Sequence, residues 1–162
     1  MTDHVARVME QWRRERPDVD PSPQGVIGRL HRVGMRLTDE LVAVYAEHGL
    51  GEGEFDILAT LRRQGPPYAL APGDLADQTM VTTGAVTKRV DRCLAQGWVT
   101  RQVSTDDGRG RVIALTQAGR ELIDAAFTAH MANEHRLLEA FTADERELLA
   151  GLLQRWAEEL GA

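Results

Sequence analysis

Hydroxyl-bearing and cationic side chains recur at helical spacing in residues 82–97, where they could hydrogen-bond to phosphates and to base edges. They are Thr83, Thr87, Lys88 and Arg92, with Thr82 before them as a helix N-cap. The opposite side of the same helix carries an apolar stripe of Val86, Val90, Cys93 and Leu94. A helix with an apolar back and this polar front fits the major groove of DNA. The segment therefore predicts a DNA-reading helix.

The segments on either side must position this helix. Residues 72–81 predict a short helix, with Pro72 in its first turn and Leu75 and Ala76 inward, followed by a tight turn. Residues 98–116 alternate between apolar and polar, turn on the polar tip at residues 106–110, and alternate again. This order predicts a winged helix-turn-helix, in a chain that is mainly α with a small β-wing.

Charge is distributed unevenly along the chain. Residues 82–111 hold six cations and three acids, a net charge of +3, against −6 for the whole chain, which leaves −9 for the remainder. A basic module on an acidic body is typical of a protein that touches phosphates with one face only. Indiscriminate coating of nucleic acid is not expected.

Further helices are predicted on both sides of this module. They lie at residues 2–16, 24–48 and 53–65, after Thr116, and after Thr142, whose capping box with Glu145 begins the last helix. We expect a single chain of 162 residues with three parts. Residues 1–23 form an added helix and linker, residues 24–50 and 117–162 form dimerisation helices, and residues 51–116 form the winged helix-turn-helix.

The terminal helices hold more apolar surface than a compact DNA-reading module can cover. They either cap the core of one chain or interlock with those of a second copy. We favour an obligate homodimer, because DNA readers of this size usually present two recognition helices about one turn of duplex apart, ~34 Å. The expected DNA partner is then a palindromic double-stranded operator.

Other classes of function find little support in the residues. There is no phosphate-cradling glycine loop, nucleophile elbow or pair of carboxylates in a plausible cleft, so no enzyme is expected. His130 and His135 are five residues apart, which is unsuited to one metal on one helix face, and no metal or cofactor is expected. No apolar run could span a membrane, and a single cysteine fits a reducing cytoplasm.

In this order and spacing, four fragments resemble the MarR family of bacterial transcription regulators over residues 24–160. They are EFDILATL, MVTTGAVTKRVDRCLAQGWV, DDGRG and VIALTQAGREL. The resemblance implies a winged-helix homodimer, usually a repressor, that leaves its operator when a small molecule binds. It also implies that the wing arginine enters the minor groove. Gly108 stands where the family often has a cation, so Arg109 takes that role, with Arg111 as a phosphate contact.

The N-terminal segment is similar to the urate-responsive branch of the family, the PecS, UrtR and HucR type. Carried over position by position, that resemblance implies a ligand site of Trp12, Asp56, Arg89 and Arg101. An aromatic ring, an acceptor and guanidinium groups suit a planar anionic purine such as urate. Asp56 and Arg101 are expected to pair when no ligand is bound.

Alternatives remain open for the signal and for its effect. The effector could be a different small aromatic or carboxylate anion, or oxidation at Cys93 could take its place. The protein could also be an activator, or a dimerisation scaffold that does not bind DNA. The cationic helix face argues against the scaffold.

Overall fold

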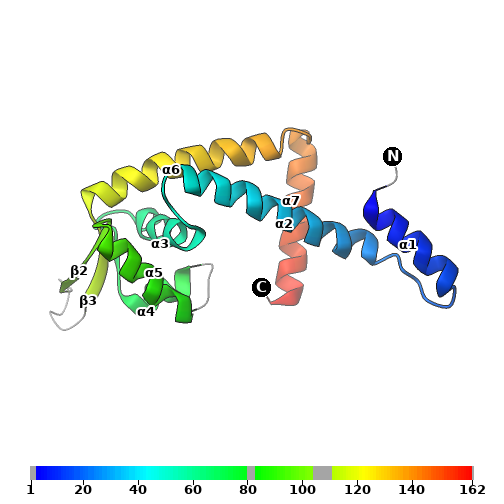
Figure 1. Ribbon diagram of the computed structural model, residues 1–162, viewed down its shortest axis with the longest axis horizontal. Coiled ribbons are helices and arrows are strands. Elements are labelled where there is room, and N and C mark those ends of the chain that lie inside the picture. Colours follow the sequence, from blue (N-terminus) through cyan, green and yellow to red (C-terminus); the bar gives the residue numbers. More distant parts are fainter. Residues whose placement is uncertain (1–2, 80–82, 104–110, 162) are drawn as a thin grey trace. The chain divides into compact units, whose positions relative to one another are not determined.

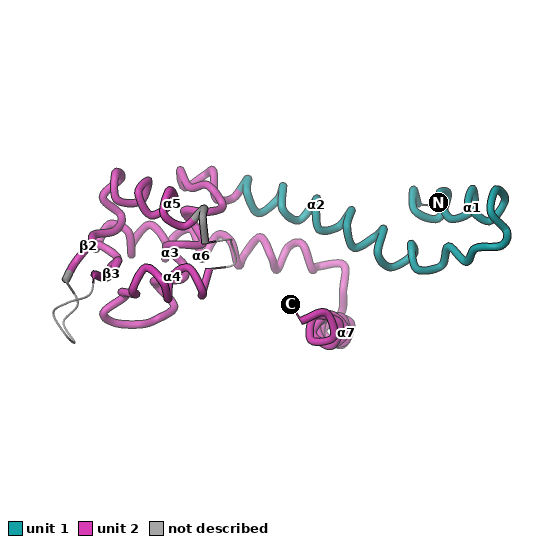
Figure 2. Tube along the Cα trace, turned by 90° about the horizontal axis from the view of Figure 1, so that it is seen from below, with its two compact units in different colours: residues 1–43 teal, residues 44–162 magenta. Residues whose placement is uncertain are grey.

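The computed structural model describes residues 3–79, 83–103 and 111–161, which form helices and one small sheet (Figure 1). In chain order these are α1 (His4–Glu15), α2 (Gln24–Glu47), α3 (Glu52–Arg63), β1 (Ala69–Leu70), α4 (Pro72–Gln78), α5 (Thr83–Ala95), β2 (Val99–Val103), β3 (Arg111–Leu115), α6 (Gln117–Leu137) and α7 (Ala143–Leu160). The chain divides into two compact units, residues 1–43 and 44–162, coloured separately in Figure 2. The predicted helices are all confirmed within a few residues at each end.

The first unit contains α1 and most of α2. Asp3 caps α1, since its Oδ1 accepts a hydrogen bond of 2.7 Å from the backbone N–H of Ala6. The other carboxylate oxygen of Asp3 lies 2.7 Å from Nε of Arg29, so the same side chain ties α2 to the start of α1. Val5 is the one side chain of α1 that is buried, and it packs toward Gly28.

The core of the second unit is centred on α3. Ile57, Leu58 and Leu61 are fully buried there, as their helical spacing predicted. Other elements of the unit also contribute almost fully buried side chains to this core, namely Leu75, Cys93, Val99, Ile113 and Ile123. Both α5 and α6 pack against α3, which therefore supports the predicted DNA-reading helix from behind.

A three-stranded antiparallel sheet has the strand order β1-β3-β2. The pairing of β2 with β3, from Val99 opposite Leu115 to Val103 opposite Arg111, confirms the predicted ribbon. The sequence did not predict β1, a strand of only two residues that pairs with Ile113 and Ala114. Such a short strand has no detectable alternation and depends on its partner, β3. The predicted wing tip at residues 106–110 lies outside the described residues.

Local capping explains where several helices begin and end. Thr116 accepts from the backbone N–H of Gly119 at 3.0 Å, and Thr142 forms the predicted capping box with Glu145 at the start of α7. Gly97 ends α5 with φ of +71°, a left-handed conformation that costs glycine little. The cap predicted for Thr82 lies outside the described residues.

Apolar side chains remain exposed on α2 and on α7. No residue of α7 is buried, although all of its residues are described. Its exposed leucines are Leu148, Leu149, Leu152, Leu153 and Leu160. Within the described ranges, no helix has the length and apolar character that a bilayer span requires.

Candidate nucleic-acid interface and effector site

The helix α5 has the two faces that the sequence predicted. Val86, Val90 and Cys93 are buried against the second unit, so the apolar stripe forms the back of the helix. Thr87, Lys88 and Arg92 are exposed. Thr83 begins the helix, although its side chain is not among those described, and Thr82 lies outside the described residues. Hydroxyl and cationic groups are thus available at the front of α5 for phosphates and base edges.

The short helix α4 packs against α3 and α5, with Leu75 and Ala76 buried as predicted. Together α4 and α5 form the predicted pair of helices of a helix-turn-helix. The ribbon β2–β3 follows α5 directly, and Arg111 at the start of β3 is exposed. Arg109 belongs to the wing tip outside the described residues, so its contact with a minor groove stays a prediction.

Two salt bridges hold α5 to its neighbours. Nη1 of Arg92 lies 2.9 Å from Oε1 of Glu54, which is buried in the first turn of α3. The Arg92 side chain is still 66% exposed, so part of its guanidinium remains free to approach DNA. Nη2 of Arg101 on β2 lies 2.7 Å from Oδ1 of Asp91. These pairs fix α5 to α3 on one flank and to the wing on the other.

Arg101 has a partner that the sequence did not predict. Arg101 forms a salt bridge with Asp91 of α5, and its predicted pairing with Asp56 of α3 stays a prediction. The physical reason is proximity: the strand β2 begins soon after α5 ends and runs next to it, so Asp91 lies within reach of Arg101. Arg101 therefore links the wing to α5.

Arg89 turns inward from α5 and lies over the start of α3. A Cβ at position 53 would be only 2.2 Å from Nε of Arg89, so only glycine at position 53 leaves room for this side chain as it lies. Its Nη1 atom is buried without a hydrogen-bond partner among the described residues. A buried guanidinium nitrogen with an unused donor is suited to an anion.

Asp56 lies half-buried in α3, near an aromatic cluster of the second unit. Burial of the hydroxyl, followed by the charges of Glu134, Glu52 and Asp56, raises the pKa of Tyr45 to about 12. Tyr45 stacks on Phe55 with ring centroids 4.0 Å apart, and its hydroxyl is 3.3 Å from Nδ1 of His130. The charge of Asp56 thus acts on a ring of this stacked cluster.

Trp12 belongs to the first unit, whereas Asp56, Arg89 and Arg101 belong to the second. Its side chain is 48% exposed and lines a cavity of about 280 Å³ with Arg16, Val19 and Pro21 among its neighbours. An exposed indole next to a cavity is available to a planar ligand. The joint site of these four residues stays a prediction.

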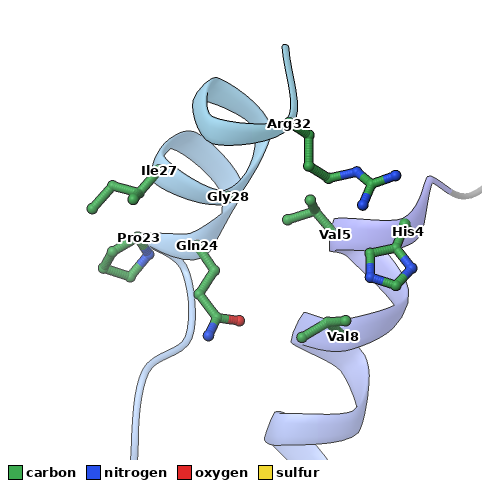
Figure 3. A pocket seen from close by; sticks show the side chains of 8 residues that line it. All are labelled: His4, Val5, Val8, Pro23, Gln24, Ile27, Gly28 and Arg32. Carbon is green, nitrogen blue, oxygen red and sulfur yellow. The ribbon is translucent and has the colours of Figure 1, made fainter. Parts of the chain in front are cut away.

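A second cavity of the first unit, of about 480 Å³, was not predicted. It lies between α1 and the start of α2 (Figure 3). Its apolar part is formed by Val5, Val8, Pro23, Ile27 and Gly28. The Arg32 guanidinium and the His4 ring extend toward the same end of this cavity, and Gln24 also lines it. Periodicity gave no signal for this cavity, because its residues come from two helices joined by an irregular linker.

The thiol of Cys93 is fully buried on the back of α5. Burial, together with the charge of Glu54, raises the pKa of this thiol to about 12. The reactive form of cysteine is the thiolate, so this environment disfavours oxidation at Cys93.

Glu54, Gly53 and Asp91 are the site residues that sequence reasoning missed. Glu54 had one local signal, because an acid three residues after Gly51 is at the capping-box position of a helix. Oε2 of Glu54 does accept from the backbone N–H of Gly51, at 3.1 Å. Its second contact, with Arg92, joins residues 38 positions apart and has no signature in one sequence.

Comparisons with known proteins place these features in a wider group. A profile of the MarR family matches residues 48–110. The transcriptional regulator PecS of Dickeya dadantii is 40% identical over 151 residues, which cover 93% of this chain and 91% of PecS. The transcriptional repressor YetL of Bacillus subtilis is 26% identical over 124 residues, covering 76% of this chain and 74% of YetL.

Solved structures agree with the predicted fold class. A crystal structure of a mutant MarR from Escherichia coli in complex with operator DNA matches with a TM-score of 0.69 and 26% identity. The match covers 82% of this chain and 95% of that one. The winged helix-turn-helix fold is therefore confirmed, and the relatives just named are regulators of transcription.

Proposed function

This chain belongs to the MarR family of transcriptional regulators, and on that premise we propose that it is a ligand-responsive repressor of a palindromic operator. The observation that carries the proposal is the exposed face of α5, with Thr87, Lys88 and Arg92, on a buried apolar back. The proposed major-groove and phosphate contacts are Thr82, Thr83, Thr87, Lys88 and Arg92. Arg109 enters the minor groove, and Arg111 contacts a phosphate.

We further propose that the active form is a homodimer joined by the terminal helices. The support is the apolar surface that the described part of one chain leaves uncovered on α2 and α7. Leu149 and Leu152 on α7, for example, are exposed, and water contact with such side chains is unfavourable. Two copies of α5 would then face successive major grooves of a palindrome.

The effector that we propose is urate or a related anionic purine, bound by Trp12, Asp56, Arg89 and Arg101. The support is the resemblance to the urate-responsive branch of the family, the relation to PecS, and the unpaired Nη1 of Arg89. An anion at this site would compete with Asp91 for Arg101 and so loosen the contact between α5 and the wing. A coupling of only ~1–3 kcal/mol is enough for such regulation.

The test begins with a duplex that the wild-type chain enriches from a random DNA library. Fluorescence anisotropy then measures affinity for this duplex and its loss as urate is added. We expect Asp56→Asn and Trp12→Phe to bind the duplex normally and to respond less to urate. If Asp56→Asn instead abolishes DNA binding, the proposed effector site is wrong.

A thermal-shift panel separates urate from other effectors. Urate, xanthine, hypoxanthine, aromatic acids and tricarboxylates are compared, because a ligand that binds only the folded chain raises its melting temperature. The largest shift with urate or xanthine supports the proposal. A larger shift with a non-purine acid would show that the effector belongs to that class of anion and is not a purine.

A further inference from the structure

The first turn of α3 makes two kinds of contact with α5. Glu54 uses both carboxylate oxygens: Oε2 accepts from the N–H of Gly51 at 3.1 Å, and Oε1 accepts from Nη1 of Arg92 at 2.9 Å. The carboxylate is buried, so solvent competes little for these hydrogen bonds. One end of this link is therefore fixed to the backbone of the helix start, and the other holds α5.

Arg89 makes the second contact, one turn before Arg92 on the same side of α5. Its side chain lies over Gly53, where a Cβ would be 2.2 Å from Nε and 2.4 Å from Cδ. Residues three apart on a helix project from neighbouring positions. Arg89 and Arg92 therefore contact the same turn of α3. Arg89 lies over Gly53, and Arg92 forms the ion pair with Glu54.

The other flank of α5 is held by Asp91, whose carboxylate is 2.7 Å from Arg101 on β2. The buried stripe of Val86, Val90 and Cys93 lies between the two flanks. Apolar packing holds a helix against its neighbours but leaves it some freedom to turn about its own axis. Directional ionic contacts on both sides of that stripe restrict this rotation.

We infer that Gly53 and Glu54 are positioning residues for DNA reading, which set the rotation of α5 through Arg89 and Arg92. The inference rests on the proposed function, because it requires α5 to enter the major groove. A small rotation of α5 moves Thr87 and Lys88 away from their base edges and phosphates. Contacts with base edges are sensitive to such a shift, whereas non-specific binding through phosphates tolerates it.

The test compares Glu54→Gln with Glu52→Gln in the full-length chain. Glutamine at position 54 can still accept from Gly51, so the helix start is kept and only the ionic contact is weakened. Glu52 is an exposed acid of the same first turn, which makes Glu52→Gln a matched control for charge and helix dipole. Anisotropy measures each variant on the duplex enriched by the wild-type chain and on a scrambled duplex.

We expect Glu54→Gln to lose about tenfold in affinity for the enriched duplex and to keep its affinity for the scrambled one, since each mismatched base contact costs roughly that factor. Glu52→Gln keeps both affinities. In an Arg92→Ala background, Glu54→Gln causes no further loss, because its effect acts through Arg92. Gly53→Ala, which displaces Arg89, lowers the ratio of the two affinities in the same direction.

Four results would overturn the inference. They are no loss in Glu54→Gln, an equal loss on both duplexes, the same loss in Glu52→Gln, and a full second loss in the Arg92→Ala background. If Glu54→Gln does not fold, Gly53→Ala decides, and unchanged discrimination in that variant overturns the inference. Failure of the wild-type chain to distinguish the two duplexes is a different result, because it refutes the proposed DNA reading itself.

Discussion

The helices α5 and α7 share an amphipathic pattern and differ in what covers their apolar sides. The stripe of α5 is buried within the chain, and ionic contacts hold the helix on both flanks. In α7 no residue is buried, and Leu148 and Leu160 are about two-thirds exposed, at 64% and 69%. The same periodicity therefore occurs in one helix whose apolar side is buried within the chain and in another whose apolar side is exposed to solvent in the described part of the chain.

This difference suits the two helices to two tasks, α5 to reading DNA and α7 to assembly. The fixed helix α5 presents a constant polar face, as groove reading requires. The uncovered helix α7 supplies apolar surface that a second copy can bury. Changes to α7 should therefore affect assembly, and changes to the front of α5 should affect DNA contact without affecting assembly.

The largest effect is expected from Leu152→Glu on α7. A carboxylate in the proposed interface would separate the dimer, and loss of the paired recognition helices lowers operator affinity at least about a hundredfold. Light scattering and anisotropy measure the two effects. Gln154→Glu places the same charge on the same helix at an exposed polar position and should leave both unchanged. A wild-type chain that is a stable monomer at micromolar concentration would contradict the assignment of α7.

A smaller effect is expected from Lys88→Ala on the front of α5. Removal of one phosphate contact weakens binding to every duplex and lowers the slope of log affinity against log salt by about one. Arg155→Ala removes an exposed cation from α7 and is the matched control, with no expected change of slope. An unaltered slope in Lys88→Ala would show that this side chain does not contact DNA.

The buried back of α5 should make stability sensitive to alkaline pH. The pKa of Cys93 is raised to about 12 from an ordinary value of 9.0, so the folded chain keeps the thiol proton where the unfolded chain loses it. The stabilisation is complete below pH 9 and falls as pH rises from 9 to 12, and burial of Tyr45 acts in the same direction. Thermal melts from pH 8 to 11 should show a shallower decline in Cys93→Ala. Equal declines would contradict the linkage.

The smallest effect is expected from hydrogen peroxide. Because the Cys93 thiol is buried and protonated, brief oxidation should leave DNA binding of the wild-type chain unchanged, as in Cys93→Ser. Mobility-shift assays compare the two proteins. If peroxide releases the wild-type chain from DNA but not Cys93→Ser, oxidation at Cys93 is the signal.

Local sequence features predicted much of the fold, because they act between residues close in the chain. The caps at Thr116 and Thr142, the stop at Gly97 and the two faces of α5 follow from spacing and backbone preference. The strand β1 was missed because two residues carry no periodic signal. Its existence depends on β3, more than forty positions later.

The contacts that hold the candidate site were much less predictable. Glu54 with Arg92 and Asp91 with Arg101 depend on how α3, α5 and β2 meet in space. The salt bridge of Arg101 with Asp91 of α5 was not predicted, and the expected pairing of Arg101 with Asp56 stays a prediction. The resemblance to a family suggested the candidate residues of the effector site, and the structure added the salt bridge of Arg101 with Asp91.

The most direct test of the account is the stoichiometry and selectivity of the wild-type chain on DNA. An anisotropy titration, with the enriched palindrome at a concentration above the dissociation constant, gives the number of chains bound per duplex. Competition with a scrambled duplex measures selectivity. We expect two chains per palindrome and a preference of at least about a thousandfold over scrambled DNA at physiological salt. Equal affinity for the two duplexes would contradict it.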